Sequence, residues 1–406
     1  MNFPLFLAKR ITTKSNRTFS KLIVRVAIAG IMLGLTIMIL AVAVLRGFKS
    51  EVIEKQRGFT GDVIVYQYDL NPTYDNVPFL LEDSIKKEIK NIPEIKSLQP
   101  FATKPGIIKA NDEIEGVVLK GIDKSYNQDF ISSILVSGKP LDFAPTDDGK
   151  LQILISSFIA KRLSLELGDE FLMYFIQEPL RKRKFEIVGI FNLGAEEIDK
   201  TYVIGDLSLI QRLNDWDANT VGGYEIRLDD FDKLEEVQAQ IYDALPIDLR
   251  AMNIVEHYPE VFQWLDLLDV NTEVILFLMI LVAVINMISA LLIIILERTE
   301  MIGILKALGF ANSGIRKVFL YNSAYLIGYG LILGNVLGLG LCYLQHKTKL
   351  IKLDPASYYV DFVPISISLS DVLLLNLGTL VVCLLVLLIP SGLVSRISPV
   401  KAISFK

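Results

Sequence analysis

Residues 297–309 of the chain are Glu-Arg-Thr-Glu-Met-Ile-Gly-Ile-Leu-Lys-Ala-Leu-Gly, and they stand between two long apolar runs. The apolar residues of this stretch recur at spacings of three and four, the period of an amphipathic helix: Met301, Ile302, Ile304, Leu305 and Leu308. We expect the helix to end at Gly309, because glycine favours the position just after a helix C-terminus. A helix this short cannot cross a bilayer, so it must lie against a membrane surface or a partner protein. The stretch therefore predicts a docking helix for a protein on the cytoplasmic side.

The composition of the 406 residues predicts membrane spans together with a sizeable soluble domain. Mean hydropathy is +0.45, 52% of the residues are hydrophobic and 21% are charged. These values are too apolar for a soluble protein of this size and too charged for a chain wholly within the membrane. The net charge of −5 gives no sign of nucleic-acid binding. The two cysteines, Cys342 and Cys383, lie in apolar runs and suggest neither a disulfide framework nor a metal pair.

Four apolar runs predict four membrane-spanning helices, at 26–45, 274–296, 318–344 and 372–394. The first run is about 30 Å long at about 1.5 Å per residue, which is enough to cross the hydrocarbon core. It lacks a small-residue cleavage site, so we expect an uncleaved anchor. Small residues spaced by four predict close helix packing, and the members of these sets are Gly30 with Gly34, and Gly330 with Gly334 and Gly338. We also expect the asparagines in or near the spans to face protein rather than lipid; these are Asn286, Asn322, Asn335 and Asn376.

The distribution of basic residues predicts the orientation of the spans. A basic lead precedes the first span (Lys9, Arg10, Lys14, Arg17 and Lys21), which places the N-terminus in the cytoplasm. With four spans, the C-terminus is cytoplasmic as well, residues 46–270 lie outside and the docking segment 297–317 lies inside. The short outer loop 345–370 runs against this rule, because it carries Lys347, Lys349 and Lys352.

The fold class expected is an α-helical membrane protein with four transmembrane helices and a large α+β extracytoplasmic domain between the first and second. The domains are 1–45, the outer domain and stalk at 46–270, and the membrane domain at 271–406. Strand and helix patterns divide the outer domain into two subdomains, 46–130 with 220–258, and 131–219. Among the expected elements are a helix at 81–90, a strand at 95–101, and a hairpin formed by 170–176 and 184–191. A helical stretch at 258–270 continues into the second span as a stalk that transmits movement.

Motifs for catalysis are absent from the sequence. There is no phosphate-binding G-x-x-x-x-G-K-[ST], no G-x-S-x-G and no H-E-x-x-H. The uncharged cores of the four spans hold no ionisable residue, which a proton- or ion-driven carrier usually needs. Paired acids such as Glu196 and Glu197 lie in polar stretches that favour solvated surface. We expect a non-catalytic membrane subunit without a cofactor, whose energy comes from another protein.

The topology and the motif between the second and third spans resemble the FtsX-type permeases of ABC transporters. The motif residues are Glu297, Arg298, Glu300, Gly303, Leu305, Lys306, Ala307, Leu308 and Gly309. Arg396, Pro399 and Ala402 are similar to the family's C-terminal end. Within the family, the lipoprotein-releasing transmembrane subunits are similar in 17–65, which includes Gly-Ile-Met-Leu-Gly at 30–34 and Leu-Arg-Gly-Phe at 45–48, and in 160–169 with the hairpin that follows.

The resemblance implies a mechanism and a set of partners. Two permease subunits pair with two copies of a cytoplasmic ATPase, which binds ATP and magnesium, and the helix between the spans sits in a groove of that ATPase. The residues implied for this coupling are Glu297, Arg298, Glu300, Met301, Gly303, Leu305, Lys306, Leu308 and Gly309. ATP-driven closure then extracts a lipoprotein from the inner membrane and passes it to a periplasmic carrier. The second permease can be an identical or a different chain.

Two further sets of residues follow from the same resemblance. Apolar walls of the first two spans would hold the acyl chains, with Met38, Val42, Ile280 and Val284 as candidates; packing or lipid-facing roles are the alternative. The hairpin turn that would contact a carrier holds Pro179, Leu180, Arg181 and Lys182, although it is shorter than the protruding loop of the capturing subunit in known heteromeric systems. A solvated turn is the alternative there.

Two other functions share parts of this pattern. An efflux pump of the macrolide-exporter type has the same topology. A regulator that transports nothing and activates a cell-wall hydrolase has a much smaller outer domain than residues 46–270. We therefore expect lipoprotein extraction, with efflux or regulation as the alternatives.

Overall fold

The structure, a computed structural model, describes residues 4, 6, 18–69, 73–111, 113–143, 151–353, 358, 360 and 362–392. The basic lead up to Arg17 and the tail with Arg396, Pro399 and Ala402 lie outside the described residues. The chain forms two compact units. The helical unit comprises Met1–Ser50, Trp264–Lys352 and Phe362–Lys406, and the sheet unit comprises Glu51–Gln263 and Leu353–Asp361.

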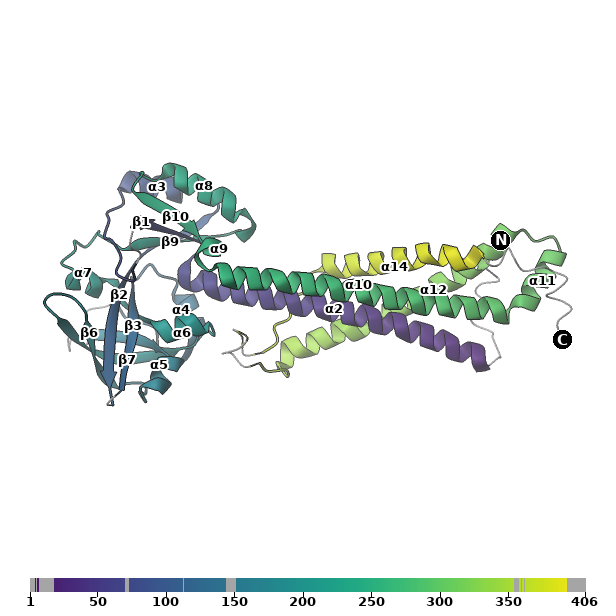
Figure 1. The fold of residues 1–406 in the computed structure, drawn as a ribbon, viewed down its shortest axis with the longest axis horizontal. Helices are drawn as coiled ribbons and strands as arrows, with labels where there is room; N and C mark the ends of the chain where they lie inside the picture. The colour runs from purple at the N-terminus through teal and green to yellow at the C-terminus, as the bar shows by residue number, and fades with distance from the viewer. Residues whose placement is uncertain are drawn as a thin grey trace. The chain divides into compact units, whose positions relative to one another are not determined.

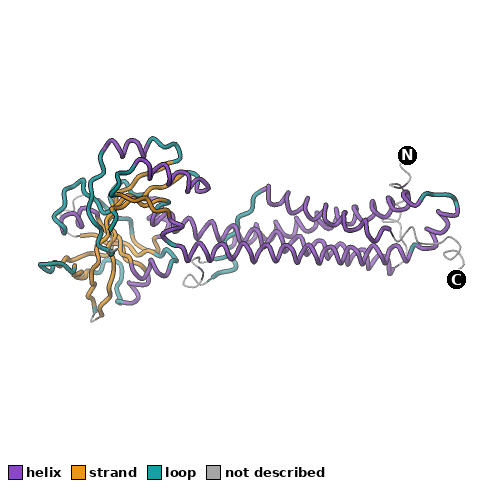
Figure 2. Tube along the Cα trace, turned by 45° about the horizontal axis from the view of Figure 1, so that its top comes forward, coloured by secondary structure: helices purple, strands orange, loops and turns teal. Residues whose placement is uncertain are grey.

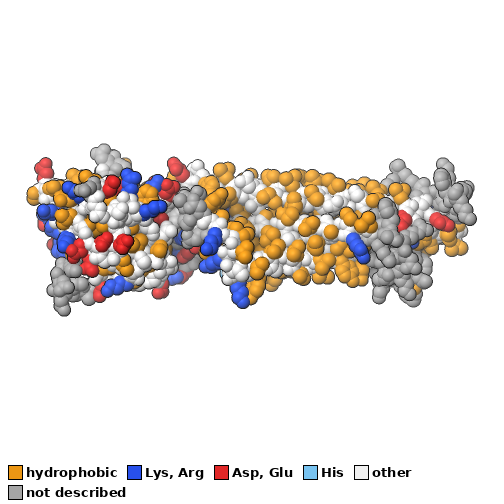
Figure 3. All heavy atoms as spheres, turned by 90° about the horizontal axis from the view of Figure 1, so that it is seen from below, with side chains coloured by type: hydrophobic (Ala, Val, Ile, Leu, Met, Phe, Trp, Pro, Cys, Tyr) orange, Lys and Arg blue, Asp and Glu red, His pale blue; other side chains and the backbone are white. Residues whose placement is uncertain are grey.

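Long apolar helices make up the helical unit (Figure 1): α2 (Thr18–Thr60), α10 (Pro259–Glu297), α12 (Asn312–Thr348) and α14 (Leu369–Ser391), with the short α11 (Thr299–Ala307) between α10 and α12. Among the described residues, these four long helices are the ones apolar enough to cross a membrane. Hydrophobic side chains cover the surface of the helical unit in the view of Figure 3, with few charges among them. The predicted fold class is confirmed, and each predicted span except the end of the fourth lies inside one of these helices.

Glycines bring α2 and α12 into close contact. Gly330, Gly334 and Gly338 of α12 lie against Ile31, Leu35 and Ile39 of α2. A Cβ atom on Gly330 would stand only 2.7 Å from Cβ of Ile31, so no larger residue fits without a shift. Thr36 Oγ1 of α2 also donates a hydrogen bond to the carbonyl of Gly334 at 3.2 Å. The predicted close packing of these glycines is confirmed.

Asparagine side chains join α12 to α14 inside the apolar layer. Asn335 Nδ2 donates to Asn376 Oδ1 at 2.7 Å, and Asn376 Nδ2 donates back to Asn335 Oδ1 at 3.0 Å. Each amide also donates to a backbone carbonyl of its own helix, four residues earlier. Asn322 is buried as well. The expectation that these asparagines face protein is confirmed, because lipid could not satisfy their polar atoms.

Ion pairs tie α2 to its neighbours beyond its apolar core. Arg46 pairs with Asp371 at 2.8 Å, and Lys49 pairs with Asp269 at 2.5 Å. Asp371 also completes a capping box with Ser368 at the start of α14. Within the helical unit, these contacts join α2 to the start of α14 and to α10.

The sheet unit alternates strands with short helices, coloured by type in Figure 2. Its strands are β1 (Val63–Gln67), β2 (Ile95–Ala110), β3 (Glu113–Ile122), β4 (Leu135–Gly138), β5 (Leu151–Ser156), β6 (Glu170–Phe175), β7 (Arg181–Phe191), β8 (Tyr202–Asp206), β9 (Gly223–Leu228) and β10 (Leu249–Asn253). Its helices are α3 (Asp83–Lys90), α4 (Gln128–Ile134), α5 (Ser157–Arg162), α6 (Glu196–Thr201), α7 (Leu207–Leu213), η1 (Phe231–Lys233), α8 (Leu234–Ala244) and α9 (Ile254–His257).

The strands form one sheet in the order β10-β1-β9-β2-β3-β8-β5-β7-β4, with β6 paired to β2 and β7. The strands expected in the first subdomain occupy one end of this order and those expected in the second occupy the other. Strands of the two expected subdomains pair at two places, β3 with β8 in parallel and β2 with β6 antiparallel, so the sheet continues through the proposed boundary. The division into two subdomains stays a prediction. The expected hairpin is confirmed as β6 and β7, which pair antiparallel.

The strand expected at 95–101 was too short, because β2 continues to Ala110. Its interior prolines favoured an early end, since proline lacks the N–H that a ladder needs. Pro105 is tolerated because β2 changes neighbour there: it pairs with β9 up to Phe101 and with β6 from Gly106. In the gap, the backbone N–H of Thr103 donates to Asn76 Oδ1 instead of to a strand.

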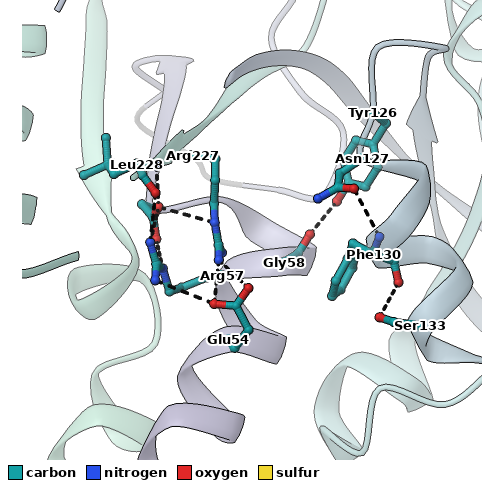
Figure 4. A network of polar contacts seen from close by, with 10 residues as sticks. Glu54, Arg57, Gly58, Tyr126, Asn127, Phe130, Ser133, Arg227 and Leu228 are labelled. Atoms are coloured by element: carbon teal, nitrogen blue, oxygen red, sulfur yellow. Dashed lines mark hydrogen bonds and ion pairs between the residues drawn. The ribbon is translucent and has the colours of Figure 1, made fainter. Parts of the chain in front are cut away.

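The last turn of α2 is anchored in the sheet unit by charged side chains (Figure 4). Asp62 is fully buried and accepts Arg57 Nη2 at 2.9 Å and the backbone N–H of Leu228 at 2.6 Å. Arg227 of β9 pairs with Glu54 of α2 at 2.5 Å. Buried charges are tolerated when they are paired and hydrogen-bonded in this way. The network thus fixes the end of α2 to β9.

A second buried ion pair lies under the same helix end. Lys120 Nζ donates to Glu225 Oε1 at 2.7 Å and also to the carbonyl of Phe59, and it stands 4.1 Å from the centroid of the Phe59 ring. Burial lowers the pKa of Lys120 and raises the pKa of Glu225, while each charge opposes the shift of the other. Tyr126 donates its hydroxyl to the carbonyl of Gly58 at 3.0 Å. The backbone carbonyls at the C-terminus of α2 thus accept hydrogen bonds from an ammonium group and a hydroxyl. These bonds replace the intrahelical partners that the last turn of a helix lacks.

Candidate functional site

The docking segment begins at a break between two helices. α10 ends at Glu297, and Arg298 has φ −103° and ψ 16°, outside the α-helical range. The Thr299 hydroxyl donates to the carbonyl of Leu296 at 2.7 Å and so satisfies a group that the end of α10 leaves free. α11 then starts as a separate helix, which the apolar period of the sequence alone does not show.

The end of α11 is the expected one. Gly309 has φ +81°, and its N–H donates to the carbonyl of Lys306 at 3.0 Å. The N–H of Phe310 donates to the carbonyl of Leu305 at 2.9 Å. These two bonds and the left-handed glycine make a Schellman motif. The predicted stop at Gly309 is confirmed.

The apolar residues of α11 divide between two faces. Ile302 and Gly303 are buried, and Met301 and Leu305 pack against the core of the helical unit. The other face is exposed and consists of Glu300, Ile304, Ala307 and Leu308; we call it the docking face. Ile304 is 47% exposed and Leu308 is 78% exposed. The coupling residues expected from the sequence do not include Ile304. Its spacing of four residues from Glu300 and from Leu308 places it on the same helix face as both.

Charged groups border the docking face. Glu300 is exposed on it, and burial lowers the pKa of Lys306 at the end of the helix. Glu297 and Arg298 are half-buried at the junction. No described residue gives a hydrogen bond to the buried Oε2 atom of Glu297.

The four residues expected to line a substrate cavity come together in the core of the helical unit. Met38 of α2 is fully buried. Val42 of α2, and Ile280 and Val284 of α10, are partly buried and pack against the same core. Within this chain they are helix-packing residues, and their lining of a cavity stays a prediction. Exposed side chains of α10 lie at Phe277, Leu281 and Ile285.

The hairpin residues have different surroundings. Pro179, Leu180 and Lys182 are exposed at the turn between β6 and β7. Arg181 is tied to its own fold, since it donates to the carbonyl of Leu213 at 2.7 Å and pairs with Asp215 at 2.8 Å. It holds the turn against the end of α7. A carrier contact at this hairpin stays a prediction. The described residues also contain no group of three His, Cys, Asp or Glu placed to hold a metal ion.

Comparison with protein families places this arrangement in a known class. A model described as FtsX-like permease C-terminal matches residues 273–399, which include α11. A model described as MacB-like periplasmic core domain matches residues 26–244, more than half of the chain. The chain therefore belongs to the FtsX-like ABC transporter permeases that carry a MacB-like periplasmic core domain.

Full-length relatives refine the class. The chain is 23% identical over 425 residues to the lipoprotein-releasing system transmembrane protein LolE of Haemophilus influenzae, with 100% of both chains covered. It is 22% identical over 417 residues to the corresponding LolC protein of Neisseria meningitidis, with 98% of this chain and 97% of that one covered. Among solved structures, the periplasmic region of MacB from Actinobacillus actinomycetemcomitans matches 52% of this chain at 15% identity and a TM-score of 0.35. That last likeness is too loose to carry an argument.

Proposed function

We propose that this permease couples ATP hydrolysis in the cytoplasm to the extraction of lipoproteins from the inner membrane, for delivery to a periplasmic carrier. The observation that carries the proposal is the docking face of α11, together with likeness to lipoprotein-releasing subunits along the whole chain. The two termini and α11 lie on the cytoplasmic side in this proposal, and the sheet unit lies in the periplasm.

The docking face supplies the contact with the ATPase. Ile304 and Leu308 are large apolar side chains held outside the core by a helix that is fixed at both ends. Exposed apolar surface of this kind marks a site of protein contact. The partner ATPase binds ATP and magnesium, and this chain contributes no catalytic residue. Burying Ile304 and Leu308 in a groove of the partner gives the contact its affinity.

Two helices carry the movement outward. α2 begins in the helical unit and ends in the sheet unit, and α10 begins in the sheet unit and ends in the helical unit. Both are unbroken helices. The ion pairs around Asp62 and Lys120 hold the end of α2 in the sheet unit. A shift of α2 that follows ATP binding is therefore passed to the strands β9 and β3, to which its end is bonded.

The remaining partners complete the proposal. A second permease subunit, identical or different, packs beside the exposed apolar side chains of α10, and the acyl chains of the lipoprotein enter between them. Met38, Val42, Ile280 and Val284 become accessible only if the helices separate, because they are packed together in the single chain. Pro179, Leu180 and Lys182 are the exposed hairpin residues available to a carrier.

The experiment that tests lipoprotein extraction is depletion of the protein in its own cells. Outer-membrane lipoproteins are expected to accumulate in the inner membrane, and fractionation followed by lipoprotein detection measures this. A variant with Ile304 and Leu308 both replaced by Asp should fail to restore sorting, whereas Ile247→Asp should restore it. Ile247 is the matched control because it is 92% exposed and lies in the sheet unit. Correct sorting after depletion would contradict the proposal.

Efflux is a second candidate, favoured by one observation. The family model that covers most of the chain is the MacB-like periplasmic core domain. An efflux function predicts that depletion raises sensitivity to an exported compound while lipoproteins reach the outer membrane normally. The same depleted cells, tested for both effects, distinguish the two functions.

A further inference from the structure

The end of α12 carries a group of cations that the transport mechanism does not use. We call residues 346–352 the lysine loop. It contains His346, Lys347, Lys349 and Lys352, together with the apolar residues Leu350 and Ile351. Leu350 is 73% exposed and Ile351 is 54% exposed. None of the three lysines forms an ion pair with any residue that the structure describes.

Other cations at the same end of the helical unit are neutralised. The backbone N–H of Ser366, which follows the lysine loop, donates to the carbonyl of Ala43 at 3.0 Å, so the segment after the loop lies beside α2 at Ala43. In that part of α2, Arg46 pairs with Asp371 and Lys49 pairs with Asp269. Among the described residues, the three lysines of the loop have no acidic partner, and Lys349 Nζ stands 4.1 Å from the centroid of the Phe362 ring.

Buried polar contacts hold the loop in place. The Gln345 side chain is buried; its Oε1 accepts the N–H of Ile351 at 3.0 Å, and its Nε2 donates to the carbonyl of Ile351 at 3.2 Å. Lys349 closes α12 in a left-handed conformation, with φ +47°, and its N–H donates to the carbonyl of Gln345 at 2.8 Å. Leu350 and Ile351 are therefore exposed by a built turn rather than by an irregular chain.

The position of the loop indicates what covers it. The apolar run of α12 ends near residue 344, so the three lysines follow directly at the border of the hydrocarbon layer. Favourable interaction with the helix C-terminus accounts for Lys347 in the last turn but not for Lys349 and Lys352 beyond it. Apolar side chains that enter the acyl boundary, next to ammonium groups at phosphate level, are the pattern of an interfacial membrane contact.

We propose that the lysine loop binds the anionic headgroups of phospholipids at the membrane surface, with Leu350 and Ile351 inserted among the acyl chains and Lys347, Lys349 and Lys352 at the phosphates. The loop lies at the opposite end of α12 from α11, so the proposed function places this contact in the outer leaflet of the inner membrane. The lipid contact itself does not depend on that orientation.

Native mass spectrometry of the full-length protein in detergent tests the proposal, with equal amounts of phosphatidylglycerol and phosphatidylcholine added. The wild type is expected to retain phosphatidylglycerol preferentially. A variant with Lys347, Lys349 and Lys352 replaced by Gln should lose this preference, by about fivefold for each lysine if each contributes about 1 kcal/mol. Replacing Leu350 and Ile351 by Ser should weaken the retention of both lipids and leave their ratio unchanged.

The matched control replaces Lys87, Lys90 and Lys96 by Gln, which removes the same charge from exposed positions of the sheet unit. An unchanged lipid ratio in the loop variant, or an equal fall in the control, would overturn the proposal. Displacement of phosphatidylglycerol by millimolar inorganic phosphate would also overturn it, since the loop would then be an ion site rather than a membrane contact. None of these outcomes depends on lipoprotein sorting, so the proposal and the proposed function can fail separately.

Discussion

Single residues at the end of α2 show how a helix that leaves the membrane is fixed in a soluble domain. Lys120 is the only buried cation that reaches the carbonyl of Phe59 among the described residues, and its charge is balanced by Glu225. A buried ion pair adds little net stability, but the loss of one partner leaves an uncompensated charge. The pair therefore specifies where the end of α2 lies rather than how strongly the domain folds.

Replacing Lys120 by Met is expected to destabilise the sheet unit by about 3–5 kcal/mol, because Glu225 then stays buried without its partner. The double variant, with Glu225 also replaced by Gln, should recover most of that loss. Hydrogen exchange of the amides in 54–62 measures the effect at the end of α2. Lys109→Met on the exposed part of β2 is the control, and an equal loss there would contradict the role given to Lys120.

The Lys120→Met variant should also depend on pH in a defined direction. Burial raises the pKa of Glu225 above its ordinary value of 4.5, and Lys120 opposes that shift in the wild type. Without Lys120 the pKa rises further, so the folded state gains stability from protonated Glu225 at low pH and loses it as pH rises through the raised pKa. Thermal unfolding should show a smaller difference from the wild type at pH 5 than at pH 8; a constant difference would argue against this cause.

Among the elements, the apolar runs predicted the cores of the four long helices and Gly309 predicted the end of α11, because hydropathy and glycine act locally. The apolar run of the first span did not show that α2 continues to Thr60. The apolar period did not show which side of α11 meets the chain's own core. Leu305 and Leu308 have the same chemistry, yet Leu305 packs inward and Leu308 is exposed. The continuation of β2 past Pro105 was missed for a related reason: it depends on a change of neighbouring strand that no local pattern records. The short helices α4, α6 and α7 were not predicted.

Close packing of α2 and α12 yields a prediction with an internal control. Replacing Gly330 by Ala places a Cβ atom 2.7 Å from Cβ of Ile31, and overpacking of this kind costs about 1–3 kcal/mol. Gly328→Ala and Gly340→Ala on the same helix meet no atom within 4 Å. Thermal denaturation in detergent should show a lower melting temperature for Gly330→Ala only. Equal behaviour of all three variants would mean that the helices do not cross at Gly330.

The asparagine pair between α12 and α14 is expected to contribute modestly. Interhelical hydrogen bonds in membranes average about 0.6 kcal/mol, since the separated helices find other partners. A double-mutant cycle with Asn335→Leu and Asn376→Leu, read from unfolding in detergent, should give a coupling of that order. Strictly additive losses would show that the two amides act independently.

In the proposed topology of the full chain, α11 and the lysine loop lie on opposite sides of the membrane. In a background with Cys342 and Cys383 replaced by Ala, Ser366→Cys, exposed in the segment after the lysine loop, should react with an impermeant thiol reagent in cells whose outer membrane has been opened. Ser313→Cys, exposed just after α11, should react only after the inner membrane is opened too. The reverse pattern would invert the topology inferred from the basic N-terminus.

Co-purification of a cytoplasmic ATPase tests whether the docking face of α11 is the ATPase contact. The wild-type protein, solubilised in mild detergent, is compared with the variant in which Ile304 and Leu308 are both replaced by Asp, and with Ile247→Asp as the control. We expect an ABC ATPase to be recovered with the wild type and the control, and the double variant to lose it while remaining folded. Recovery of the ATPase with all three proteins, or with none of them, would contradict the claim that the exposed face of α11 is where the ATPase docks.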